Sequence, residues 1–190
     1  MVEIDLTAEI GVSRGPLREA FHRLSVEGLI ETVPNRGAMV RRLSFQETAE
    51  LFEICCALET LGARLAAERT SAPAVRRSFE QAVEPIWSAL PRTVPSSYLD
   101  ENQLFHQAIA DASGNHQLAE LVRRMQLPLI LYQMSGALTP DILALSNAEH
   151  REIAKAILAG DARAAENGMR HHLNRASRFA YDLPPGVFRA

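Results

Sequence analysis

Three histidines stand at positions where a helical stripe would normally carry an apolar residue. His106, His150 and His172 each continue a stripe of mostly apolar residues at helical spacing, so all three imidazoles are predicted to face the interior. Asn102 precedes His106 by one helical turn and can add an amide oxygen. Imidazoles that converge in an apolar interior suit a divalent ion, with zinc as the first expectation and nickel or manganese as alternatives. The residues alone also allow a second interpretation, in which each histidine is hydrogen-bonded separately in the core.

The turn at Gly160 and Asp161 is predicted to bring two of these histidines opposite each other. His150 and His172 are nearly equidistant from it, and helical patterns run on either side. In an antiparallel helix pair, residues equidistant from the turn meet across the interface. The spacing therefore predicts that these two rings are neighbours.

Everything after Ser44 is predicted to be helical. Apolar residues recur at helical spacing, and proline and glycine residues interrupt the pattern. About six helices are expected, with the ranges 45–69, 73–90, 96–112, 116–135, 140–159 and 161–181. No credible strand is found in this part of the sequence, so residues 44–190 are predicted to form an all-α bundle with the three histidines inside.

Residues 1–43 follow a different pattern, in which short helices precede a β-hairpin. Gly11 ends a short first helix, Ser13 can cap a second one, and Gly28 ends that second helix. Two strand-like runs, 29–33 and 38–40, then flank the turn sequence PNRG. This order of elements is that of a winged helix-turn-helix.

Basic side chains lie where such a fold would meet DNA. Arg14 and Arg18 share one face of the second helix, and Arg36 lies at the hairpin tip. A helix fits the major groove, where arginine can bond to the O6 and N7 edge of guanine or to a phosphate. An arginine pair alone is more often solvated surface, but the turn, the cap and the basic hairpin tip together favour DNA binding.

The segment EIGVSRGPLREAFHRLSVEGLIETVPNRGAMV matches a known pattern densely. It resembles the DNA-binding domain of the GntR family of bacterial transcription regulators, and the likeness covers about the first 43 residues. The resemblance implies a homodimer that binds a palindromic operator in double-stranded DNA. The residues it places at the operator, with the capping serine, are Ser13, Arg14, Gly15, Arg18, Arg36 and Gly37.

One departure from the family pattern affects the expected DNA affinity. Family members usually carry one more helix ahead of the segment that begins at Val2. Without it, the apolar face of Leu17, Phe21 and Leu24 would be exposed. We therefore expect this 190-residue form to bind DNA less tightly than a longer form, and a DNA-free ligand sensor is an alternative if the short N-terminus is genuine.

Three segments of the helical part carry a second resemblance: ELFEICCALETLGARLAA, NQLFHQAIADASGN and AEHREIAKAILAGDARAAENGMRHHL. They resemble the FCD effector-binding domain of the FadR subfamily, over roughly residues 45–181. The resemblance implies a metal held by an aspartate and three histidines, which here correspond to Asn102, His106, His150 and His172. It also implies an effector pocket at Cys55 and Glu59, where many members have an arginine in place of Cys55. Loss of the anionic ligand weakens metal binding, and loss of the arginine removes a carboxylate clamp.

Composition excludes several classes of protein. Of 190 residues, 47% are hydrophobic and 23% charged, with a net charge of −3, which excludes a disordered chain and a protein that holds nucleic acid by bulk positive charge. Cys55 and Cys56 are neighbours, which indicates free thiols in a reducing cytosol. No signal peptide and no membrane-length apolar run are found in the sequence, so a cytoplasmic protein is expected.

Together these observations predict a mainly α, two-domain transcription regulator and not an enzyme. Residues 1–43 would bind DNA, and residues 44–190 would bind a small carboxylate effector at the metal. The enzymatic alternative is a metal-dependent hydrolase with a three-histidine site, which needs a general base beside the metal. Glu149 points about 100° away from His150 around the helix, and the sequence holds no HExxH motif.

Overall fold

The computed structural model describes residues 3–33, 37–87, 95–125 and 127–189. By its contacts the chain divides into two compact units, Met1–Leu43 and Ser44–Ala190. No helix among the described residues is both long and apolar enough to cross a membrane.

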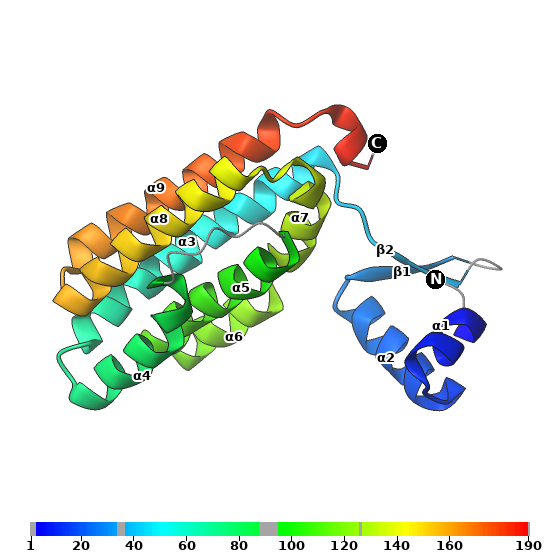
Figure 1. Cartoon of the computed structure of the whole chain (residues 1–190), viewed down its shortest axis with the longest axis horizontal. Coiled ribbons are helices and arrows are strands. Elements are labelled where there is room, and N and C mark those ends of the chain that lie inside the picture. Colours follow the sequence, from blue (N-terminus) through cyan, green and yellow to red (C-terminus); the bar gives the residue numbers. More distant parts are fainter. Residues whose placement is uncertain (1–2, 34–36, 88–94, 126, 190) are drawn as a thin grey trace. The chain divides into compact units, whose positions relative to one another are not determined.

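The first unit has two short helices and a β-hairpin (Figure 1). Helix α1 spans Glu3–Ile10 and α2 spans Arg14–Val26, and strands β1 (Ile30–Val33) and β2 (Gly37–Val40) pair antiparallel. The predicted winged helix-turn-helix order is confirmed.

Packing in the first unit is centred on a few small and aliphatic side chains. Leu17, Ile30 and Ala38 are buried, whereas Phe21 and Leu24 of the α2 stripe are half-buried. Gly11 has a φ of 72°, in the left-handed region that favours glycine, and this makes the tight turn between α1 and α2 possible.

The second unit is a bundle of helices. Their bounds are α3 Phe45–Arg69, α4 Pro73–Val83, α5 Pro95–Ala112, α6 His116–Arg124, α7 Leu127–Met134, α8 Pro140–Ala159 and α9 Ala162–Tyr181. Three short 3-10 segments add to them: η1 Glu84–Trp87, η2 Ser135–Ala137 and η3 Pro185–Val187. In Figure 1, α3, α8 and α9 run side by side, and α5 packs against α3, α4 and α6.

Apolar stripes from α3, α4, α5, α8 and α9 form the core of this bundle. Its fully buried members include Phe105 and Ile109 of α5, Ile153 and Ile157 of α8, and Met169 of α9. The helical spacing read from the sequence therefore places the stripes correctly, and the predicted all-α bundle is confirmed.

Two of the predicted helices end earlier than expected. The range 116–135 is divided, because Met125 takes an extended backbone conformation (φ −64°, ψ 142°) between α6 and α7. Pro128 is the signal for this division, since proline is tolerated in a first turn but not in a helix interior. The range 73–90 ends as α-helix at Val83 and continues as η1, where Pro85 has no N–H to donate; residues 88–90 lie outside the described part.

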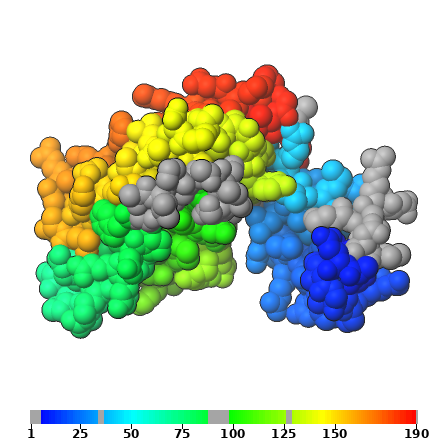
Figure 2. Space-filling view, in the orientation of Figure 1, coloured from blue at the N-terminus to red at the C-terminus, as the bar shows by residue number. Residues whose placement is uncertain are grey.

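The C-terminal segment packs against the start of α3. Phe188 meets Phe45 edge to face at 5.5 Å between ring centroids, and Tyr181 meets the same ring at 5.2 Å. Arg189 pairs with Glu47, whose side chain also closes a capping box with Ser44. Figure 2 shows this segment in red along the surface of the helical unit.

Candidate functional site

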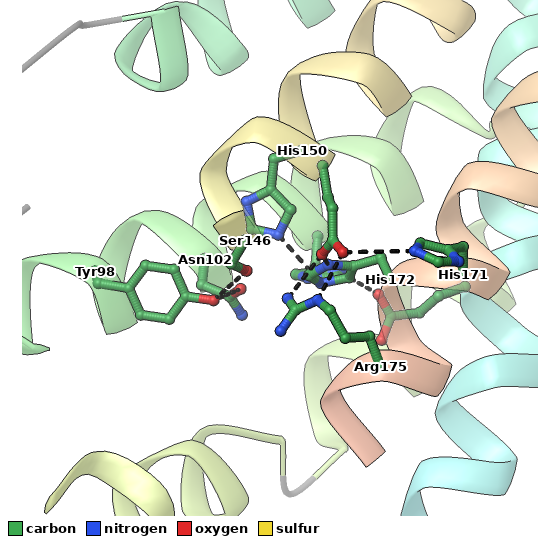
Figure 3. Close-up of polar contacts among 10 residues, drawn as sticks. Tyr98, Asn102, Ser146, His150, His171, His172 and Arg175 are labelled. Atoms are coloured by element: carbon green, nitrogen blue, oxygen red, sulfur yellow. Dashed lines mark hydrogen bonds and ion pairs between the residues drawn. The ribbon is translucent and has the colours of Figure 1, made fainter. Parts of the chain in front are cut away.

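The three predicted histidines meet inside the helical unit. His106 comes from α5, His150 from α8 and His172 from α9, and each is no more than 4% exposed. One ring nitrogen from each lies within 4.8 Å of the others. Nε2 of His150 and Nε2 of His172 are 3.2 Å apart (Figure 3). The two rings are therefore neighbours, as predicted from their nearly equal sequence distances to the turn at Gly160 and Asp161.

Two glutamates bond to the Nδ1 atoms of two rings of this cluster, His106 and His172. Glu59 of α3 bonds to Nδ1 of His106, and Oε2 of Glu149 accepts from Nδ1 of His172 at 2.7 Å. A carboxylate on Nδ1 sets the ring tautomer and leaves Nε2 for a ligand, the arrangement common behind metal-binding histidines. The sequence analysis did not predict that Glu59 and Glu149 bond to the histidines. A glutamate on the apolar face of α3, such as Glu59, indicates a buried partner for its carboxylate.

Aromatic packing orients the third ring. Phe105 of α5 stacks on His150 with centroids 4.2 Å apart and an interplanar angle of 26°. Because Phe105 is only 1% exposed, its ring is fixed by the core.

The histidine cluster fits a divalent metal. In tetrahedral zinc coordination at about 2.0 Å, two nitrogens lie about 3.3 Å apart, and the His150 and His172 nitrogens are 3.2 Å apart. His106, His150 and His172 would hold the ion. A metal-binding histidine usually donates its other ring N–H to a carboxylate, and Glu59 and Glu149 lie at Nδ1 of His106 and His172 in this way. The metal role of Asn102 stays a prediction.

Electrostatics at the site favour a neutral imidazole beside an ionised carboxylate. Burial lowers the pKa of His172, although its hydrogen bond to Glu149 opposes this. Burial acts to raise the pKa of Glu149, but hydrogen bonds from His172 and Arg175 outweigh it and bring that pKa to about 2. Neutral imidazole is the form that binds metals.

A small cavity of about 30 Å³ lies beside the histidines. Asn102, His106 and His172 line it, together with Arg175 and apolar residues of α3, α7, α8 and α9. A second cavity of about 240 Å³ also borders Asn102 and His106, and it is lined mainly by α5, α6 and α7. Both cavities therefore border the same two residues of α5, Asn102 and His106.

A chain of hydroxyl groups holds Asn102. Tyr98 donates from its hydroxyl to Oδ1 of Asn102 at 3.1 Å, and that hydroxyl lies 2.6 Å from Oγ of Ser146 (Figure 3). Burial raises the pKa of Tyr98, so its hydroxyl stays protonated and can donate. The amide oxygen of Asn102 keeps a second lone pair beyond this bond, and both N–H groups of the amide are left for a ligand.

The two residues predicted for the effector pocket are buried on α3. Cys55 is 1% exposed, and burial raises the pKa of its thiol. The described residues that line the small cavity include Phe52 of α3 but neither Cys55 nor Glu59. Glu59 acts through His106 instead. Their part in effector recognition stays a prediction.

Four of the predicted DNA-contacting residues, Ser13, Arg14, Gly15 and Arg18, are exposed on the first unit. Ser13 is the residue before α2, but its side chain accepts no capping bond. Arg14, Gly15 and Arg18 are exposed in the first two turns of α2, and a Cβ on Gly15 would meet nothing within 4 Å. Gly37 begins β2 with a φ of 78°, whereas Arg36 lies outside the described residues.

Comparison with known proteins gives matches over both units. Residues 1–40 match the family model described as bacterial regulatory proteins, gntR family, and residues 50–175 match the FCD domain. A probable D-xylose utilization operon transcriptional repressor of Paenarthrobacter nicotinovorans is 33% identical over 90% of this chain and 74% of its own length. The HTH-type transcriptional repressor GlaR of Escherichia coli K12 is 29% identical over 88% of this chain and 80% of its own length. Among solved structures, Escherichia coli McbR/YncC superposes with a TM-score of 0.81 at 20% identity, over 95% of this chain and 86% of that one.

Proposed function

The chain belongs to the gntR family of bacterial regulatory proteins and carries an FCD domain, and from this premise we propose a transcription factor that responds to a small organic acid. Its relatives are named as transcriptional regulators and repressors, so it is a regulator and not an enzyme. The hydrolase alternative also lacks support from the site, because the carboxylate of Glu149 is held by Arg175 and His172.

The first unit would read DNA through α2. Arg14 and Arg18 lie one turn apart on its exposed face, together with His22. In a major groove these guanidinium groups can bond to guanine edges or to phosphates, while the hairpin contacts the neighbouring groove. A homodimer on a palindromic operator would place two such helices on successive half-sites and so raise affinity.

The helical unit would hold a divalent metal at His106, His150 and His172. The observation that carries this proposal is the convergence of three buried imidazoles, two of which have carboxylates on Nδ1. A bound metal would act as a Lewis acid for an oxygen of the effector. Zinc is the first candidate for a three-histidine site, with nickel and manganese next.

Helix α9 would transmit effector binding at the histidine cluster toward the DNA-binding unit. It carries His172 at the site, and its last residue, Tyr181, contacts Phe45 at the first residue of α3. In the sequence, Phe45 is the second residue after the first unit, which ends at Leu43. Effector binding can alter DNA affinity only if it favours one arrangement of α9 over another.

The test compares His150→Ala with His116→Ala, which removes an exposed histidine from the start of α6. Zinc content of the purified proteins would be measured by elemental analysis, and DNA affinity by fluorescence anisotropy on the promoter region of the protein's own gene. We expect His150→Ala to lose the metal and the effect of small carboxylates on DNA affinity, while His116→Ala keeps both. Unchanged metal content in His150→Ala would contradict the metal site.

A further inference from the structure

Arg175 of α9 is a charged residue in the lining of the small cavity. Of the described residues that line this cavity, it is the only lysine or arginine. Its side chain is 22% exposed, and it lies one turn beyond His172 on the same helix. It therefore places a permanent positive charge beside the histidine cluster.

Glu149 holds only one edge of this guanidinium. Nε donates to Oε1 at 2.6 Å and Nη2 donates to Oε2 at 2.7 Å, a side-on pair. Arginine has five N–H groups, so two on Nη1 and one on Nη2 remain. Among the described residues, Nη1 has no hydrogen-bond partner, and Figure 3 shows this nitrogen on the side of Tyr98 and Asn102.

A second residue that lines the cavity, Asn102 of α5, also presents a donor. Asn102 is 3% exposed, and its amide oxygen accepts from Tyr98, which leaves the NH₂ group for a ligand. Ser146, Tyr98 and Asn102 thus form a hydrogen-bonded row that fixes the amide orientation. Donors from two helices, α9 and α5, and no described carboxylate side chain among the lining residues make this cavity suitable for an anion.

We propose that the free end of the Arg175 guanidinium and the Asn102 amide bind the carboxylate of the effector. This inference rests on the proposed function, because it names the ligand class of the same site. Glu149 keeps the guanidinium oriented, and Nη1 and Nη2 give the planar fork that matches a carboxylate. Arg175 is then the specificity-determining residue for an acidic rather than a neutral effector.

Acetate is the probe, since the cavity of about 30 Å³ admits only a small group, and acetamide is its neutral analogue. Zinc content is measured first for each protein, and titrations followed by NMR are made at equal zinc occupancy. Arg175→Gln removes the charge and the fork, and Arg175→Lys keeps the charge alone. Arg170→Gln is the matched control, because Arg170 is on the same helix but pairs with Glu166 at the surface.

We expect the 190-residue wild type and Arg170→Gln to bind acetate equally and in preference to acetamide. Arg175→Gln is expected to weaken acetate binding about tenfold or more, and Arg175→Lys by a smaller factor. Equal acetate binding by Arg175→Gln and Arg170→Gln would overturn the inference, as would equal binding of acetate and acetamide or no acetate binding by the wild type. If Arg175→Gln does not bind zinc, the acetate affinities of Arg175→Lys and wild type are compared instead, and equal affinities would overturn the inference.

The two proposals fail in different ways. A wild type without zinc contradicts the proposed metal site, and the acetate titration of that protein still reports on Arg175. A wild type that holds zinc, with acetate binding indifferent to Arg175, contradicts only the role of Arg175.

Discussion

His172 donates from Nδ1 to Oε2 of Glu149 across 2.7 Å, although the two residues lie on different helices and 23 positions apart. Arg175 holds the same carboxylate through two further bonds. One glutamate thus orients a ring of the candidate metal site and an arginine of the candidate effector site, so a change at Glu149 should affect both.

Glu149→Gln should weaken zinc binding about 10- to 100-fold, because the ring of His172 loses its charged partner. Competition with a chromophoric chelator measures this affinity. Glu152→Gln is the control, since Glu152 is an exposed glutamate on the same helix, paired with Lys155. Equal zinc affinity of the two variants would show that the hydrogen bond to His172 does not support the metal.

The carboxylate of Glu149 should also make the unfolding free energy depend on pH in the acid range. Its pKa falls from 4.5 to about 2 in the folded protein, so the unfolded state binds the proton more readily. The stabilisation is therefore complete above about pH 4.5 and is lost as pH falls toward 2, by up to about 3 kcal/mol. Urea unfolding of metal-free protein at several pH values should show a flatter acid dependence in Glu149→Gln than in wild type. A parallel dependence in both proteins would contradict this assignment.

Arg18→Ala should abolish specific DNA binding with little loss of stability, because Arg18 is exposed on the second turn of α2. Anisotropy with operator and scrambled DNA measures the specific part. Arg23→Ala is the control on the same helix, where Arg23 pairs with Glu19 in solvent. The prediction fails if Arg18→Ala retains operator affinity.

Phe188→Ala should lower the unfolding free energy by about 2 kcal/mol, since a side chain only 6% exposed loses its contact with Phe45. It should also reduce the effect of ligand on DNA affinity, because it loosens the C-terminal segment against the start of α3. Val187→Ala, at a half-buried neighbouring position, is the milder comparison. Thermal unfolding and anisotropy measure the two effects, and an unchanged ligand response would exclude this contact from the coupling.

Cys55 should resist alkylation in the folded protein. It is 1% exposed and burial raises the pKa of its thiol, so little thiolate forms and reagent cannot reach it. Iodoacetamide followed by mass spectrometry should modify the half-buried Cys56 first and Cys55 only after unfolding. Modification of Cys55 at the rate of Cys56 would mean that α3 opens readily at this point.

In residues 1–43, local sequence signals were sufficient to predict the order of helices and strands. Gly11, Gly28 and the hairpin turn sequence predicted the order of α1, α2, β1 and β2, because glycine and turn residues act within a few positions. In the helical half, the same reasoning placed the ends of α3, α8 and α9 closely but overlooked Pro128 as the start of a new helix.

The sequence by itself determined which face of each helix His106, His150 and His172 occupy, since helical periodicity depends only on spacing along one chain segment. It also determined that His150 and His172 meet, because a short turn forces an antiparallel pair into register. Tertiary structure decided that Glu59 and Glu149 support the rings, that Tyr98 engages the oxygen of Asn102, and that Arg175 borders the cavity. These contacts join side chains of different helices, and they depend on helix separation and side-chain rotamers that no repeat in the sequence encodes.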